Sequence, residues 1–166
     1  PTVILLHYPS IVEDTISYRP PRVKIEISCL SMDEPREERQ IRSLIGETFE
    51  DEDSDANSNI RTVVPTRTFL EKLFLLAEEF QKEKPRSVRM SRHLYDLEKL
   101  MDTEYGREAL ADRSLYDAIV EHRKAYYALK YANYDLHNPE TINFMIPKKE
   151  MEVWKADYAD MQRFFI

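Results

Sequence analysis

Two charged residues, Glu26 and Lys72, lie at positions where they could take part in phosphoryl transfer. Glu26 is in the middle of an alternating apolar segment, and Lys72 is at the edge of an apolar helical stripe. A third, Asp96, is inside a second amphipathic segment and is by itself expected only to form a surface ion pair. A carboxylate on a rigid strand suits Mg²⁺, which prefers oxygen ligands. A helix-borne lysine offers a compact positive charge that can bind a triphosphate.

Each of these residues also has a plainer structural interpretation. Glu26 would face solvent on the polar side of a half-exposed strand. Lys72 would extend over apolar surface until its ammonium group reaches water. Asp96 would form a weak surface ion pair with Arg92 or Lys99. The residue types and spacing alone leave both interpretations open.

Positive charge is concentrated in the segment 82–93, which has five Lys or Arg residues against one Glu. Such a segment could bind phosphate groups or a nucleic-acid backbone, or it could be a solvated loop. Within it, Arg86 and His93 have the Arg-x6-His spacing of one class of helical ribonucleases, in which the histidine does acid–base work. Pro85 disfavours placing both on one helix.

An acidic segment at 47–55 contains two D-x-D patterns, Asp51/Asp53 and Asp53/Asp55. Carboxylates two residues apart face the same side only on a strand. Because these acids stand among Glu, Ser and Asn residues, the segment is predicted to be a solvated loop rather than a metal site.

The elements that would position these residues begin with strands. The apolar run 3–8 predicts a buried strand, and the strict alternation over 22–28 predicts a second strand that carries Glu26. The segment 41–49 fits either a strand or a short helix, and 60–64 predicts another short strand.

After Pro65 the apolar residues recur at helical spacing. Thr68 and Glu71 could form a capping box for a helix over 68–80, and further helices are expected at 91–101 and 114–133. A last apolar stripe comprises Met151, Trp154, Tyr158, Met161 and Phe165. Strands followed by helices indicate an α+β protein, with a strand part at 1–64 and a helical subdomain at 65–166.

Composition excludes several classes of protein. The 166 residues include 24 Lys+Arg and 31 Asp+Glu, which gives a net charge of −7. With two glycines, Gly46 and Gly106, no Gly-rich phosphate loop or dinucleotide fingerprint can form. The single cysteine, Cys29, excludes a disulfide scaffold and indicates a reducing cytoplasm. No apolar run approaches the roughly 20 residues that span a bilayer, so no membrane association is expected.

Three segments in this order carry a family resemblance: RVKIEI at 22–27, PTRTFLEKL at 65–73 and SRHLYDL at 91–97. Together they resemble the AbiEii/AbiGii nucleotidyltransferase toxins, which are abortive-infection proteins of phage defence. The similarity runs from about residue 20 to at least residue 101. The E-K-L helix followed by the (R/H)-x-Y-D-L motif is more specific as a pair than either part alone.

The resemblance implies a role for each matching residue. Glu26 matches the third carboxylate, which would help to hold catalytic Mg²⁺. Lys72 matches the lysine expected to contact the nucleotide phosphates, and Asp96 matches a late active-site aspartate. We extend a phosphate-binding role to Arg92, which precedes that aspartate. The implied fold is a few strands of a polymerase-beta-like nucleotidyltransferase sheet followed by a C-terminal helical bundle.

The implied activity is Mg²⁺-dependent transfer of a nucleotide from an NTP to an acceptor, which in some relatives is RNA such as a tRNA end. A cognate antitoxin would be a protein partner. The alternative hypothesis is a non-catalytic module that engages an antitoxin or another protein.

The sequence departs from the family pattern at its amino end. In the family, a Gly-Ser turn and a D-x-D metal pair precede the third carboxylate, and nothing before Glu26 supplies either one. We therefore expect the chain to be the C-terminal part of a longer nucleotidyltransferase, and to be inactive alone because two metal ligands are missing.

Overall fold

The computed structural model describes residues 2–9, 21–28, 30, 32, 35–49 and 57–165. The D-x-D patterns at 51–55 lie outside these residues. The chain divides into two compact units, Pro1–Asp33 and Glu34–Ile166, and each is considered by itself.

The first unit contains an antiparallel pair, β1 (Thr2–His7) and β2 (Arg22–Ile27). Ile4 pairs with Ile25 and Leu6 pairs with Val23, so the alternating side chains of β2 share an apolar face with β1. Both predicted strands are confirmed. The predicted burial of the first strand is wrong, because Leu6 is 53% exposed. A two-stranded ribbon leaves both of its faces open unless another element covers them.

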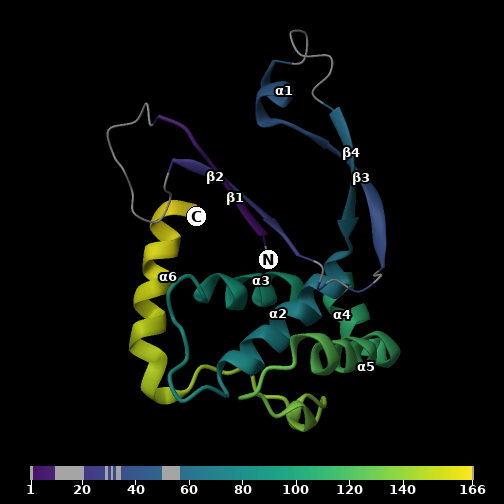
Figure 1. Cartoon of the computed structure of the whole chain (residues 1–166), viewed down its shortest axis with the longest axis vertical. Coiled ribbons are helices and arrows are strands. Elements are labelled where there is room, and N and C mark those ends of the chain that lie inside the picture. Colours follow the sequence, from purple (N-terminus) through teal and green to yellow (C-terminus); the bar gives the residue numbers. More distant parts are fainter. Residues whose placement is uncertain are drawn as a thin grey trace. The chain divides into compact units, whose positions relative to one another are not determined.

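The second unit begins with another antiparallel pair, β3 (Arg36–Arg42) and β4 (Asn57–Val63) (Figure 1). The ambiguous segment 41–49 contains the end of β3 and a short helix, α1 (Leu44–Thr48). Ser43 caps this helix by accepting a hydrogen bond from the backbone N–H of Gly46. The strand β3 was not predicted, since its sequence REERQIR has charges where an apolar alternation would be.

The remainder of the second unit is helical. The α-helices are α2 (Pro65–Glu79), α3 (Ser91–Met101), α4 (Glu104–Ala111), α5 (Arg113–His122) and α6 (Met151–Phe165). A π-helical turn follows α5 at Arg123–Tyr127, and 3₁₀ turns occur at Tyr134–Leu136 and Lys148–Glu150. The predicted order of strands followed by helices, an α+β fold, is confirmed.

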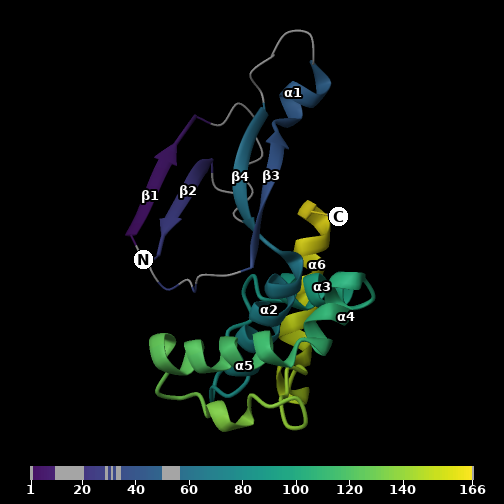
Figure 2. The ribbon, with the colours of Figure 1, turned by 90° about the vertical axis from the view of Figure 1, so that its right-hand side faces the viewer.

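Helix α2 runs through the middle of the helical part and contacts α3, α4 and α5 (Figures 1 and 2). It supplies much of the core, including Phe69, Leu70, Leu73, Phe74, Leu76 and Ala77. The helix begins at Pro65 with Val64 as its N-cap, so the capping box predicted at Thr68 is wrong. Proline suits the first helical position because its missing N–H would have had no helical partner.

The helix predicted over 114–133 is shorter than its periodicity indicated. Helix α5 ends at His122, and the π-helical turn after it ends where Ala128 adopts a φ of 44°. A left-handed residue stops the helical ladder, although the apolar spacing continues through Leu129. Helix α4 was not predicted; its N-cap is Thr103, whose hydroxyl accepts a hydrogen bond from the Gly106 N–H.

Candidate functional site

Two of the predicted site residues, Lys72 and Asp96, meet in the structure. Lys72 Nζ on α2 lies 2.5 Å from Asp96 Oδ2 on α3, although the residues are 24 positions apart in sequence. The pair forms because α2 and α3 pack against each other. The side chains are 23% and 37% exposed, so this pair is at the edge of the helical core and open to solvent.

Helix α3 is held in place by an aspartate that the sequence did not single out. Asp157 of α6 accepts hydrogen bonds from the backbone N–H groups of Arg89 at 2.6 Å and Ser91 at 3.0 Å, and from the Ser91 hydroxyl at 2.5 Å. Arg89 has a φ of 60°, which turns the chain into the helix. Asp157 thus satisfies N–H groups that Met90, the N-cap, cannot satisfy through its side chain. Its 66-residue separation from Ser91 leaves no local signal in the sequence.

His93 lies one turn before Asp96 on the same helix and is half-buried. Burial, together with the positive charges of Lys72 and Arg92, lowers the pKa of His93 from 6.5 to about 4. Its Nδ1 is buried and has no hydrogen-bond partner among the described residues. The histidine is therefore neutral at pH 7 and adds no positive charge beside the Lys72–Asp96 pair.

Arg92 is exposed in the first turn of α3, close enough to influence the pKa of His93. Arg86, in contrast, precedes the helix, and its backbone N–H donates to Glu79 Oε1 at 2.6 Å. Arg86 and His93 therefore do not share one helical face. A helical ribonuclease with the Arg-x6-His spacing would need both side chains on the same face of one helix.

Glu26 belongs to the β1–β2 unit and lies on the face of β2 opposite Ile25. Its Oε1 lies 2.6 Å from Lys24 Nζ, and the two side chains are 55% and 48% exposed. The hydrogen bond and the charge of Lys24 lower the pKa of the Glu26 carboxyl, which is ionised at neutral pH.

The residues described by the structure do not complete a Mg²⁺ site. Among them, no group of three or more His, Cys, Asp or Glu side chains could hold a metal ion. Glu26 supplies one carboxylate, whereas a metal site for phosphoryl transfer is usually built from more than one carboxylate. We therefore derive no step through a metal from these residues.

A buried ionic cluster was also missed by the sequence analysis. The Arg123 guanidinium donates from Nε to Glu78 Oε1 at 2.7 Å and from Nη2 to Glu78 Oε2 at 2.5 Å, and its Nη1 donates to Glu71. Burial opposes the charge on Arg123, but the hydrogen bonds and charge of Glu78, with the charge of Glu71, raise its pKa above the usual value. Arg123 and Glu78 are 45 residues apart in the sequence, so no local pattern indicated this cluster.

Comparison with known proteins identifies the family. The model described as "Nucleotidyl transferase AbiEii toxin, Type IV TA system" matches residues 2–166. The chain therefore belongs to the AbiEii nucleotidyltransferase toxin family, and the similarity recognised from about residue 20 onward extends over nearly the whole chain. No curated protein and no solved structure matches the chain significantly. Within the described residues, no helix is both long enough and apolar enough to cross a bilayer.

Proposed function

We propose that this chain carries the phosphate-binding part of a Mg²⁺-dependent nucleotidyltransferase, which transfers a nucleotide from an NTP to an acceptor such as RNA. The observation that carries the proposal is the pair of Lys72 and Asp96, which two helices bring together from the two motifs of the family resemblance. A surface ion pair that formed by chance would not be expected to join these two motif positions.

In the proposed site, Lys72 contacts the triphosphate and Asp96 fixes the direction of the lysine. The ammonium group has three N–H donors, and one of them donates to Asp96. The others remain for phosphate oxygens, and exposed Arg92 adds a second cation on α3. Phosphoryl transfer depends mainly on positioning and on charge neutralisation, which such fixed cations provide.

Glu26 would contribute one carboxylate to Mg²⁺ binding, with the other ligands coming from the D-x-D pair of the family motif. The ion would neutralise phosphate charge when bound. We propose that transfer requires that pair in addition to Glu26, and that a form without the pair is inactive. A cytoplasmic location, with access to NTPs and RNA, fits this proposal.

The test is a transfer assay with each α-labelled NTP, Mg²⁺ and total cellular RNA, on the chain and on a form that carries the D-x-D segment. Label should enter RNA with the longer form, and Lys72→Ala or Asp96→Ala should reduce the rate by about 100-fold, the scale of losing one fixed charge-stabilising group. Lys99→Ala is the matched control, because Lys99 is an exposed lysine on α3 that forms an ion pair with neighbouring Glu98, lies over the Tyr95 ring and does not contact Asp96 among the described residues. If the Lys72 variant transferred label as fast as the unaltered protein, the assignment would be wrong.

The second candidate function is a non-catalytic module that binds an antitoxin. The observation that favours it is the apolar face of the β1–β2 pair, on which Ile4, Val23 and Ile27 are 43–52% exposed. Under this hypothesis Glu26→Ala, Lys72→Ala and Asp96→Ala would leave toxicity in cells unchanged. Loss of toxicity in these three variants, at unchanged protein level, would favour the transferase.

A further inference from the structure

Asp157 ties α6 to the amino end of α3 through both oxygens of its carboxylate. Oδ1 accepts from the Arg89 N–H at 2.6 Å, and Oδ2 accepts from the Ser91 N–H at 3.0 Å and from the Ser91 hydroxyl at 2.5 Å. Arg89 has a left-handed φ of 60°, a conformation that costs energy in a residue with a Cβ atom. The turn into α3 therefore depends on bonds from a helix that is distant in the sequence.

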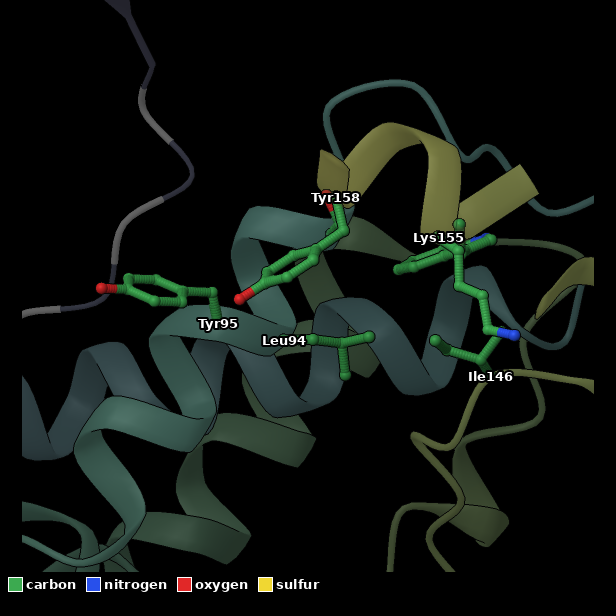
Figure 3. A pocket seen from close by; sticks show the side chains of 7 residues that line it. Leu94, Tyr95, Ile146, Lys155 and Tyr158 are labelled. Carbon is green, nitrogen blue, oxygen red and sulfur yellow. The ribbon is translucent and has the colours of Figure 1, made fainter. Parts of the chain in front are cut away.

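Side-chain packing next to this tie leaves a gap. A pocket of about 190 Å³ lies between α3 and α6, and its lining includes Ser91, Leu94, Trp154 and Tyr158. Figure 3 shows Leu94 and Tyr158 at this gap, whereas the Tyr95 ring points away from it. Because side chains do not fill the pocket, apolar packing restrains α3 less here than a filled core would. The polar tie is correspondingly more important for the orientation of the helix.

The carboxyl end of α3 is held in a different way. Gly106 of α4 lies so close to α3 that a Cβ atom there would be 2.4 Å from the Leu100 carbonyl oxygen and 2.7 Å from Met101 Cα. Close backbone packing thus fixes this end, and Asp157 fixes the other. Asp96 lies between the two, about 1.4 helical turns after Ser91.

A small rotation of α3 would be enough to separate Asp96 from Lys72. Side chains extend about 5–6 Å from a helix axis, so a rotation of about 20° would move Asp96 by about 2 Å. This displacement is comparable with the 2.5 Å between Asp96 Oδ2 and Lys72 Nζ. The hydrogen bond of this pair therefore depends on the groups that fix the rotation of α3.

We infer that Asp157 is a positioning residue for the Lys72–Asp96 site: by fixing the amino end of α3 it sets the direction of Asp96, and through Asp96 that of the Lys72 ammonium group. Its role in phosphate binding rests on the proposed function, whereas its role in orienting α3 does not. The last helix of the chain, α6, thus contributes to the site without lying in it.

Two variants weaken the tie by different amounts. Asp157→Asn keeps the shape of the side chain but replaces one acceptor oxygen with an NH₂ donor, so at least one of the three hydrogen bonds is lost. Ser91→Ala removes the hydroxyl bond alone. Asp160→Asn is the matched control, because it removes the same charge from an exposed position of α6 that forms no hydrogen bond with α3 among the described residues.

His93 reports the orientation of α3 without any assay of activity. Burial and the charges of Lys72 and Arg92 hold its pKa at about 4, against the opposing charge of Asp96. If α3 rotates in Asp157→Asn, His93 becomes more exposed and moves away from Lys72, so its pKa should rise toward 6.5. At about pH 5.5 its ring should then be partly protonated in this variant and neutral in the unaltered chain and in Asp160→Asn.

The measurement is a titration of the histidine ring protons by NMR, with the His93 signal assigned by its loss in His93→Gln. A pKa that stayed near 4 in Asp157→Asn would overturn the inference, whatever the activity of the protein. If Asp157→Asn does not fold by circular dichroism, Ser91→Ala decides the question. It should move the pKa of His93 in the same direction by a smaller amount, and an unchanged value would overturn the inference.

ATP binding to the folded chain, measured by calorimetry, separates a positioning role from a purely structural one. Asp157→Asn should weaken ATP binding by about tenfold, and Asp160→Asn should stay within about twofold of the unaltered chain. ATP affinity that stayed unchanged in Asp157→Asn while the pKa of His93 rose would show that Asp157 orients α3 without serving phosphate binding, which overturns the positioning role. If the unaltered chain binds no ATP, the proposed function fails, and the His93 titration still decides whether Asp157 orients α3.

Discussion

Helix α2 carries two ion-pair groups at adjacent positions, and they are built in opposite ways. Glu71, together with Glu78, binds Arg123 in a cluster where the Glu78 and Arg123 side chains are each 4% exposed. Lys72 binds Asp96 in a pair where the side chains are 23% and 37% exposed. Because consecutive helical residues point about 100° apart, one short stretch of α2 serves both a closed site and an open one.

The closed cluster engages every nitrogen of the Arg123 guanidinium. Nε and Nη2 donate to the two Glu78 oxygens, Nη1 donates to Glu71, and the guanidinium carbon lies 4.5 Å from the Tyr127 ring centroid. In the open pair, a single hydrogen bond joins Lys72 to Asp96. The difference shows that charge pairing alone does not identify a functional site, because a ligand-binding pair must also keep donors that solvent and a ligand can reach.

The largest effect is expected from breaking the closed cluster. Arg123→Ala leaves the Glu78 carboxylate buried without its partner, so the free energy of unfolding should fall by about 3–5 kcal/mol. Urea unfolding followed by circular dichroism measures this change. Arg113→Ala is the control, because its pair with Asp117 is exposed and should cost less than about 1 kcal/mol. Similar losses for the two variants would remove the distinction between closed and open pairs.

A smaller loss of stability is expected when the pH is lowered. It arises from His93, which lies next to the open Lys72–Asp96 pair. The pKa of His93 is lowered in the folded protein, so between pH 6.5 and about 4 the unfolded chain binds more protons than the folded one. Stability is therefore fully present above pH 6.5 and decreases as the pH falls toward 4. For a half-buried group that solvent partly screens, His93 should contribute about 1 kcal/mol to this decrease.

His93→Gln tests this expectation through thermal unfolding measured at several pH values. The variant should lose part of the decline between pH 6.5 and 4. His137, whose pKa burial also lowers, would account for a remaining part. An unchanged pH profile in His93→Gln would show that this histidine is not held neutral beside Lys72 and Asp96.

The same contrast explains how much the sequence could predict. Lys72 and Asp96 were found because each lies in a recognisable helical motif, and packing of two correctly predicted helices brought them together. Arg123, Glu78 and Asp157 were missed, since their partners lie 45 to 68 residues away and nothing local marks them. Periodicity identified α3 and α6, but it overextended α5 beyond the left-handed residue Ala128.

The strands show what side-chain periodicity could not predict. Apolar alternation identified β2, whereas the charged β3 forms through backbone pairing with β4, which side-chain periodicity does not report. Burial of β1 could not be predicted from its apolar residues, because burial depends on what covers a ribbon rather than on the ribbon's composition.

The smallest effect on stability, and the sharpest test of the contrast, is expected at the open pair. A double-mutant cycle with Lys72→Met and Asp96→Asn should give a coupling energy below about 1 kcal/mol, because solvent screens the pair and both side chains lose freedom when they meet. The coupling should weaken further in 1 M salt, where the Debye length is about 3 Å. Urea unfolding of the four proteins measures it.

The same four proteins should differ far more in nucleotide binding than in stability. Lys72→Met removes the donors proposed for phosphate, so the affinity for ATP, measured by calorimetry, should fall by about tenfold or more while the unfolding midpoint barely moves. A coupling energy of about 3 kcal/mol with unchanged ATP affinity would instead make the pair a structural tie like the Arg123 cluster. Because α2 carries both groups, the outcome decides whether adjacent residues of one helix divide folding and phosphate binding between them.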